Sequence, residues 1–181
     1  EVFISQRDPE AFGTVIFPSI EGTRPLLLEI QALIGPTAFG TGRRSAMGRD
    51  TSRLNMILAT LTARLGIPLT DMDVYLNVAG GMRITDPALD LAVVCALLSA
   101  YTQTPLPADM VAFGEVGLAG EVRNASRSEA RIKEAVNLGF KQIYCPMDRN
   151  GRTLTSHCKG IDRIARLMSE IPELTDMLKA S

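Results

Sequence analysis

The chain has 181 residues, of which 46% are hydrophobic and 22% charged, and its formal net charge is −1. These values are typical of a globular chain with one domain, long enough to build a core without disulfides or metal. The longest apolar run without a charge spans residues 91–98. Because this run is far too short to cross a bilayer, we expect no membrane-spanning segment.

Basic and acidic residues are segregated along the chain. Residues 40–66 hold five arginines against Asp50 alone, residues 67–121 hold seven acids against Arg83 alone, and residues 122–166 hold ten bases against four acids. Arginine outnumbers lysine by 15 to 4, and guanidinium groups bind phosphates bidentately. The pattern fits a nucleic-acid footprint and fits equally well solvated helix faces that pair with the acidic middle.

Three cysteines, Cys95, Cys145 and Cys158, cannot all pair, and none lies in a Cys-x-x-Cys motif. A reduced, cytoplasmic setting is the simplest account. Cys95 lies within an apolar run, so we expect it in the core. Cys145, His157 and Cys158 lack the fourth ligand that a structural zinc site requires, so no metal site is predicted.

The first half of the chain is predicted to hold two strands and a helix. Residues 14–20 and 26–34 have the apolar pattern of strands, joined by a turn at residues 21–25. Residues 35–47 have the composition of a loop. Asp50 is predicted to cap a helix that carries leucine and isoleucine at helical spacing and ends at Gly66.

The second half mixes strands and helices. Residues 73–78 form a predicted strand, after which Asp86 and Pro87 open a buried helix that is apolar nearly all round. The pattern then predicts a strand pair (110–116 and 118–122), a capping box at 126–129 that opens a helix to residue 138, a strand at 142–145, and helices at 161–168 and 172–178. Since the elements do not alternate regularly, the predicted fold class is α+β (mixed α/β).

The glycine turn at Gly80 and Gly81 does not predict a nucleotide site. It lacks the Lys-Ser/Thr pair of a phosphate-binding loop. Asp86 and Asp90, in the first turn of the next helix, complement the helix dipole and would repel a phosphate there.

Several motifs in the same order resemble a known family. They are residues 21–27 (EGTRPLL), 73–81 (DVYLNVAGG) and 113–123 (FGEVGLAGEVR), with a helix at 129–138 followed by Gly-Phe-Lys. Together they resemble the C-terminal Lon-protease-like domain of the RadA (Sms) family of bacterial DNA-repair proteins, over essentially the whole chain. The resemblance implies a Lon-type fold at residues 13–181 and a linker at 1–12 from a preceding ATPase domain. ATP, magnesium and zinc would bind in preceding domains, and no cofactor is expected here.

The resemblance also implies that peptidase chemistry is lost. Lon enzymes carry a nucleophilic serine in Gly-Pro-Ser-Ala-Gly, and Asp86-Pro87-Ala88-Leu89-Asp90 occupies those places here. The partner lysine, which activates the serine, corresponds to Glu129, with Lys133 one turn further on. Ser126 and Ser128 are better explained as capping residues. The alternative is an active Ser-Lys peptidase with an unrecognised dyad.

The function that the resemblance implies is DNA repair and recombination. The whole protein would be an ATP-driven branch-migration helicase that works with the RecA recombinase, and this domain would hold a ring of six copies together and contact DNA. Arg43, Arg44, Arg53 and Arg64 are the leading phosphate-binding candidates, and Arg83, Arg123 and Arg127 form a second group. The alternative is an oligomerisation scaffold without DNA contact.

We predict that the chain does not cleave casein or fluorogenic peptides above the buffer rate, because a methyl group at position 88 cannot attack a carbonyl. Ala88→Ser alone is expected to restore nothing, since a base and an oxyanion hole are also needed. Turnover that disappears in Ser126→Ala or Ser128→Ala would contradict this.

Overall fold

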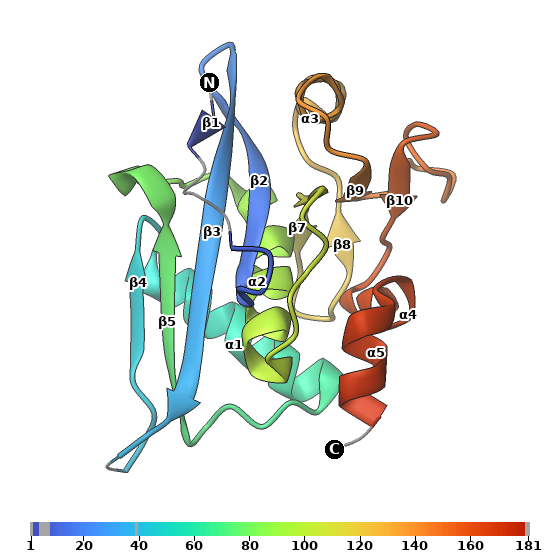
Figure 1. Cartoon of the computed structure of the whole chain (residues 1–181). Helices are drawn as coiled ribbons and strands as arrows, with labels where there is room; N and C mark the ends of the chain where they lie inside the picture. The colour runs from blue at the N-terminus through green and yellow to red at the C-terminus, as the bar shows by residue number, and fades with distance from the viewer. Residues whose placement is uncertain (1, 4–7, 39, 180–181) are drawn as a thin grey trace.

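The computed structural model describes residues 2–3, 8–38 and 40–179, and a mixed sheet of eight strands forms its centre (Figure 1). The strand order is β10-β9-β6-β2-β3-β5-β4, with β1 beside β3. The bounds are β1 Val2–Phe3, β2 Thr14–Glu21, β3 Arg24–Pro36, β4 Arg44–Met47, β5 Met72–Val78, β6 Met110–Ala112, β9 Gln142–Cys145 and β10 Cys158–Gly160. The pairs β2–β3 and β3–β5 are antiparallel and the others are parallel. The mixed α/β class is confirmed.

A short separate hairpin and five α-helices complete the described part of the chain. The hairpin pairs β7 (Glu115–Val116) with β8 (Val122–Arg123). The helices are α1 Thr51–Leu65, α2 Asp90–Thr102, α3 Ser128–Asn137, α4 Leu167–Glu170 and α5 Pro172–Lys179. Short 3-10 turns lie at Ala79–Gly81, Pro87–Leu89 and Ile164–Arg166. No helix of this part is long and apolar enough to cross a membrane.

Helix α2 lies at the centre of the core, as its apolar sequence predicts. It packs on β2 and β3 and also contacts α1 and α5. Residues 91–98 are at most 1% exposed, which includes the predicted core residue Cys95. Burial on all sides explains why this helix has no polar face.

The predicted ends of α1 are confirmed. The Asp50 carboxylate accepts a hydrogen bond from the Ser52 amide at 2.8 Å, and Gly66 closes the helix in the left-handed conformation with φ 68°. A side-chain acceptor at the start and a glycine at the end satisfy groups that an isolated helix leaves unpaired.

Several predicted boundaries were wrong because pairing partners distant in sequence decide them. Residues 44–47, expected in a loop, form the parallel edge strand β4 against β5. Residues 110–112 join the main sheet as β6, so only β7 and β8 form the expected pair. Strand β10 was not predicted, and the helical segment expected from residue 161 begins at Ile164.

The predicted capping box at residues 126–129 was also wrong. Arg127 precedes α3 with a φ of 56°, no side chain caps the helix, and the Ser128 hydroxyl donates to the Ala125 carbonyl at 3.0 Å. The residue that caps a helix in a capping box has an extended backbone. The residue before α3 is Arg127, whose backbone is left-handed instead, so the box does not form.

Where β3, β5 and β4 run side by side, one face of the sheet carries large apolar side chains that no described residue buries. Along β5, Val74, Leu76 and Val78 are buried while Tyr75 is 40% exposed. Tyr75 pairs with Leu33 of β3 on one side and with Ser45 of β4 on the other. Met47 follows Ser45 by two residues, so it lies on the same face of β4. Figure 1 shows α1 and α2 on the opposite side of these strands. We call Leu33, Met47 and Tyr75 the open sheet face.

The start of the chain, which the sequence assigned to a linker, contributes to the sheet. Val2–Phe3 form β1, which pairs in parallel with Leu27 and Leu28 of β3. The domain boundary at residue 13 stays a prediction.

Candidate nucleic-acid interface

A fully buried carboxylate, Asp90, pairs with Arg49 and Arg53 at the start of α1. Its Oδ1 accepts from Arg49 Nη2 at 2.7 Å and from Arg53 Nε at 3.0 Å. Its Oδ2 accepts from Arg53 Nη2 and, at 3.1 Å, from the Val116 amide. Both oxygens are therefore saturated, and the side-chain hydrogen bond to Asp90 raises the pKa of Arg53 above its ordinary value.

Arg49 ties this carboxylate to the neighbouring loop. It stands between β4 and α1, is 6% exposed, and donates from Nη1 to the carbonyls of Ile84 at 3.0 Å and Asp86 at 2.9 Å. Arg49, Arg53 and Asp90 form one hydrogen-bonded network. This network joins the start of α1, the start of α2 and strand β7. Buried polar networks of this kind hold a single geometry when their members are paired.

A second buried guanidinium, Arg131 of α3, holds the turn that contains Ala88. Arg131 is 1% exposed and donates to Asp86 Oδ2 at 2.5 Å, to the Pro18 carbonyl at 2.8 Å and to the Ser126 carbonyl at 2.9 Å. It also lies over the rings of Phe17 and Phe113, with its guanidinium carbon 5.6 and 5.8 Å from the ring centres.

The positions that the resemblance assigned to a catalytic dyad lie in different surroundings. Ala88 is 2% exposed, and its carbonyl accepts from the Gly114 amide at 2.7 Å. Glu129 and Lys133 are exposed on α3 and line a cavity with His157. Arg131 is two residues from each of them and so lies on the opposite side of the helix. The α3 side chain that reaches the turn of Ala88 is therefore Arg131.

Three predicted phosphate-binding arginines meet around the hairpin of β7 and β8. Arg53 Nη2 donates to the Val116 carbonyl at 3.0 Å, and Arg64 Nε donates to the Leu118 carbonyl at 3.2 Å. Arg123 of β8 is exposed and lies 3.6 Å from Glu121. We call Arg53, Arg64 and Arg123 the hairpin arginines. Among the described residues, each uses only part of its donors, so the remaining donors are available to a ligand.

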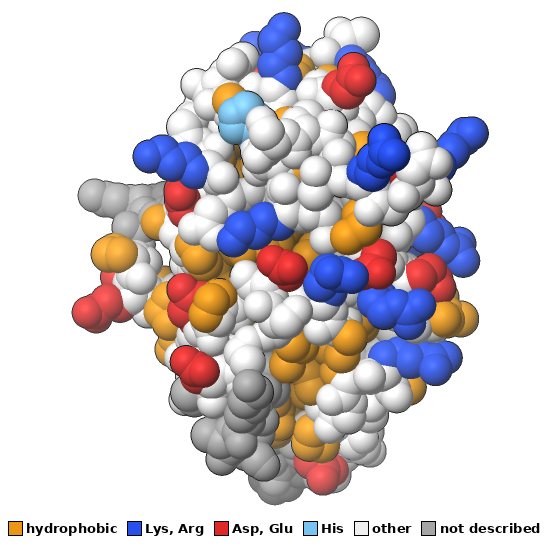
Figure 2. Space-filling model, turned by 90° about the vertical axis from the view of Figure 1, so that its right-hand side faces the viewer, with side chains coloured by type: hydrophobic (Ala, Val, Ile, Leu, Met, Phe, Trp, Pro, Cys, Tyr) orange, Lys and Arg blue, Asp and Glu red, His pale blue; other side chains and the backbone are white. Residues whose placement is uncertain are grey.

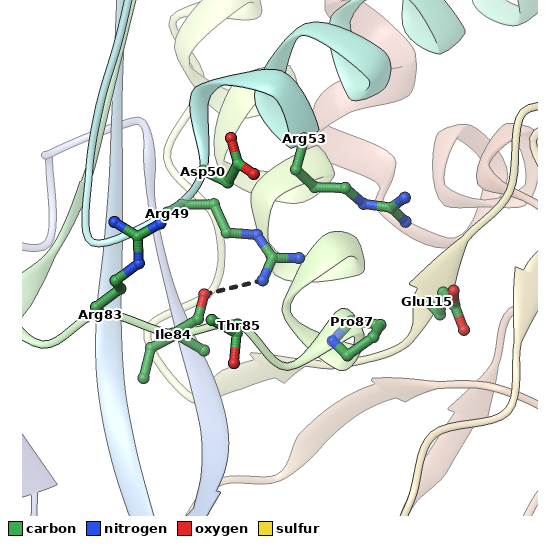
Figure 3. Close-up of a pocket in the computed structure, with 8 residues that line it drawn as sticks. All are labelled: Arg49, Asp50, Arg53, Arg83, Ile84, Thr85, Pro87 and Glu115. Carbon is green, nitrogen blue, oxygen red and sulfur yellow. Dashed lines mark hydrogen bonds between the residues drawn. The ribbon is translucent and has the colours of Figure 1, made fainter.

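Arg83 belongs to an adjacent cavity of about 230 Å³, which we call the Arg49 cavity (Figure 3). Its lining residues are Arg49, Asp50, Arg53, Arg83, Ile84, Thr85, Pro87 and Glu115. In Figure 3 the Arg49 guanidinium lies between Arg83 on one side and Arg53 on the other, with Glu115 beyond Arg53.

The other predicted arginines do not join this group. Arg44 donates to the carbonyls of Met72 and, at 2.7 Å, Leu69, so it fastens the start of β4 to the start of β5 and the turn before it. Arg43 is exposed, and its backbone amide bonds to the Asp73 carboxylate at 2.7 Å. Arg127 donates to the Gly22 carbonyl at 2.7 Å, at the turn between β2 and β3.

The structure adds arginines that sequence reasoning missed. Arg123 shares a cavity of about 710 Å³ with Arg149 and Arg166, beside Asp148 and Asp162. In the view of Figure 2, most Lys and Arg side chains lie toward the right-hand side, with Asp and Glu side chains among them. The sequence could have indicated that Arg131 is buried, because Arg131 lies one turn before Ala135 and therefore on the same face of the helix. No sequence pattern distinguishes Arg49 from its neighbours.

The thiols give no metal site. Among residues 2–3, 8–38 and 40–179, no group of three or more His, Cys, Asp or Glu side chains could hold a metal ion. Burial raises the pKa of Cys95 to about 12. Cys145 and Cys158, on neighbouring strands, interact, and the hydrogen bond from Cys145 lowers the pKa of Cys158 to about 6.

Comparison with known proteins identifies the family. A family model described as subunit ChlI of Mg-chelatase matches residues 45–149. DNA repair protein RadA of Rickettsia bellii (strain RML369-C) is 52% identical over 150 residues, which cover 83% of this chain and 34% of the relative. RadA of Rickettsia conorii (strain ATCC VR-613 / Malish 7) is 52% identical over 170 residues, 92% of this chain and 38% of the relative.

A relative from a third organism gives the same result. RadA of Bacillus subtilis (strain 168) is 50% identical over 147 residues, 81% of this chain and 32% of the relative. This chain belongs to the RadA family. Its residues 45–149 also fall within the family that the ChlI model describes. The chain spans about a third of the length of these RadA relatives.

We predict that Asp90→Asn lowers the free energy of unfolding by about 3–5 kcal/mol, because it leaves the buried Arg49 without its compensating charge. Urea denaturation of the variant and the parent chain measures the difference. Asp162→Asn is the matched control, since Asp162 pairs with Arg166 at the surface, where ion pairs contribute little. Equal effects of the two substitutions would contradict the central role of Asp90.

Proposed function

We propose that this chain is a non-proteolytic, Lon-like domain of a RadA-type DNA-repair protein and that it contacts DNA through backbone phosphates. The observation that carries the proposal is the gathering of Arg53, Arg64 and Arg123 around the β7–β8 hairpin, next to Arg83 in the Arg49 cavity. The relatives' name, DNA repair protein RadA, supports a partner of this kind.

The chemistry of the hairpin arginines suits phosphate rather than base recognition. They come from α1 and β8, are partly or fully exposed, and keep unused guanidinium donors. Arginine binds phosphate oxygens bidentately, and such contacts position a protein on nucleic acid without reading its sequence. Arg43, Arg44 and Arg127 stay secondary candidates, because Arg44 and Arg127 already donate to backbone carbonyls and Arg43 lies apart from the hairpin.

The absence of peptidase chemistry is proposed from the surroundings of Ala88. The side chain at the serine position is a buried methyl group, and the α3 side chain that reaches the same turn is Arg131. A guanidinium stays protonated in proteins, so Arg131 cannot act as the general base that a serine nucleophile needs.

The activity of the longer protein is proposed from the family alone. We propose that it hydrolyses ATP with magnesium, carries a zinc site, and drives branch migration together with the RecA recombinase. None of these activities needs a cofactor in this chain.

A second candidate function is self-association, which the open sheet face favours. A ring of six copies is proposed from the family resemblance alone. Leu33 is 62% exposed, Met47 68% and Tyr75 40%, and they line a cavity of about 230 Å³ across three neighbouring strands. Adjacent exposed apolar side chains often mark protein contacts. The face lies on strands other than the hairpin, so both functions can act at once.

We predict that Arg64→Gln/Arg123→Gln weakens DNA binding and lowers the slope of log affinity against log salt by about one to two units, one for each phosphate that no longer meets an arginine. Fluorescence anisotropy at several salt concentrations measures both quantities. Arg43→Gln/Arg127→Gln removes the same net charge elsewhere and is expected to change the slope less. Equal slopes for the two double variants would show that the hairpin is not the interface.

We predict that the chain self-associates at high concentration, and that Leu33→Glu/Met47→Glu shifts it toward monomer, because charged side chains resist burial in an apolar contact. Light scattering reports the mass, with the exposed Leu138→Glu at the C-terminal end of α3 as control. A strictly monomeric parent chain, or an unchanged double variant, would remove the support for the open sheet face.

A further inference from the structure

We infer that the Arg49 cavity is a binding site for a single phosphate group. The cavity lies where the start of α1, residues 83–87 and strand β7 meet, and three guanidinium groups line it (Figure 3). The sequence predicted that Asp86 and Asp90 would repel a phosphate here, but Asp86 is paired with Arg131, and Asp90 with Arg49 and Arg53. Its volume of about 230 Å³ is far more than one water molecule needs.

The first observation is an unpaired donor on Arg49, one of the residues that line the cavity. Arg49 is only 6% exposed, yet its Nε has no hydrogen-bond partner among the described residues. Its Nη atoms are already bound to Ile84, Asp86 and Asp90. A buried donor on a charged group is costly to leave unpaired, so an acceptor that bonds to Nε would lower the free energy of the site.

The second observation is the supply of unused donors on the cavity walls. Within the described residues, the Arg83 guanidinium makes no hydrogen bond or ion pair, and Arg53 spends only Nε and Nη2 on Asp90 and Val116. Arg83 and Arg53 lie on either side of Arg49 in Figure 3. An occupant between them can accept from three guanidinium groups in three directions, which suits a tetrahedral phosphate better than a planar carboxylate.

The third observation is the local charge. Asp90 supplies one negative charge to two guanidinium groups, so the pair keeps one positive charge, to which Arg83 adds another. Two carboxylates oppose it: Asp50, which caps the positive end of α1, and Glu115, which lies beyond Arg53. Three guanidinium groups are therefore matched by three carboxylates, so the cavity offers directed donors and no excess positive charge. This suits one phosphate group and not a polyphosphate, and Glu115 lowers the affinity.

The phosphate has two possible sources, a free phosphate ion and a phosphate of DNA. The site goes beyond the proposed DNA contact, because it can hold a free ion even if the chain does not bind DNA. The Arg49 cavity and the hairpin arginines share only Arg53, so the two are separable by substitution.

The test is thermal unfolding and phosphorus NMR of the 181-residue chain in inorganic phosphate, with chloride at matched ionic strength as reference. We expect a saturable rise of Tm and broadening of the phosphate signal. Arg83→Gln is expected to weaken phosphate binding about tenfold, the equivalent of one charge-assisted hydrogen bond. Arg152→Gln, exposed and outside the cavity, is the matched control.

Glu115→Gln distinguishes a direct effect on phosphate binding from a loss of stability. Removing this opposing carboxylate is expected to tighten phosphate binding severalfold, while a merely destabilised variant would bind more weakly. No saturable response to phosphate in the parent chain, or equal responses in Arg83→Gln and Arg152→Gln, would overturn the site.

Oligonucleotides with and without a terminal phosphate separate the sources. A preference for the phosphorylated end that is lost in Arg83→Gln assigns the site to a DNA end, and equal binding that is weakened in Arg83→Gln assigns it to an internal phosphate. A response to the free ion without DNA binding would leave the site standing and refute the proposed DNA contact. If the parent chain does not respond to phosphate and Arg83→Gln still binds DNA, the phosphate site is refuted and the proposed DNA contact stands.

Discussion

The arrangement of the arginine-lined surface depends on one buried carboxylate. Asp90 is fully buried and receives hydrogen bonds from Arg49, Arg53 and the Val116 amide. It therefore fixes the start of α1, the start of α2 and strand β7 relative to one another. A buried carboxylate is costly unless its oxygens are fully paired, and this pairing aligns two guanidinium groups at the surface of the core. The hairpin arginines and the Arg49 cavity are both built on that alignment.

Arg131 has the same role on the other side of the turn that contains Ala88. Its guanidinium joins α3, β2 and Asp86, and two aromatic rings face it. Asp86 meanwhile caps the turn by accepting from the Ala88 amide at 2.9 Å. The turn that the resemblance aligns with the serine loop of Lon peptidases thus holds an ion pair whose guanidinium is buried. The arginine of this pair cannot serve as a base, and it contacts Asp86, two residues before Ala88.

The two proposed interfaces occupy different parts of the molecule. The hairpin arginines and the Arg49 cavity lie around β7, β8 and the start of α1, whereas the open sheet face lies on β3, β5 and β4. Charged and apolar contacts have different salt dependence, because exposed charges are screened and apolar burial is not. A domain built in this way can hold copies together on one surface while it contacts a polyanion on another.

The sequence by itself determined the local features: the capped helix between Asp50 and Gly66, the buried helix after Pro87, the strands 14–21 and 142–145, and the alanine at position 88. These depend on neighbours along the chain, which the pattern of residues records. Only the tertiary structure decided that residues 44–47 form a strand, that Arg127 breaks the capping box, and which arginines are buried. Arg43, Arg44, Arg49 and Arg53 look alike in sequence. Their roles differ because Asp90, Met72 and Leu69 come from distant segments, and no local pattern carries the position of a distant partner.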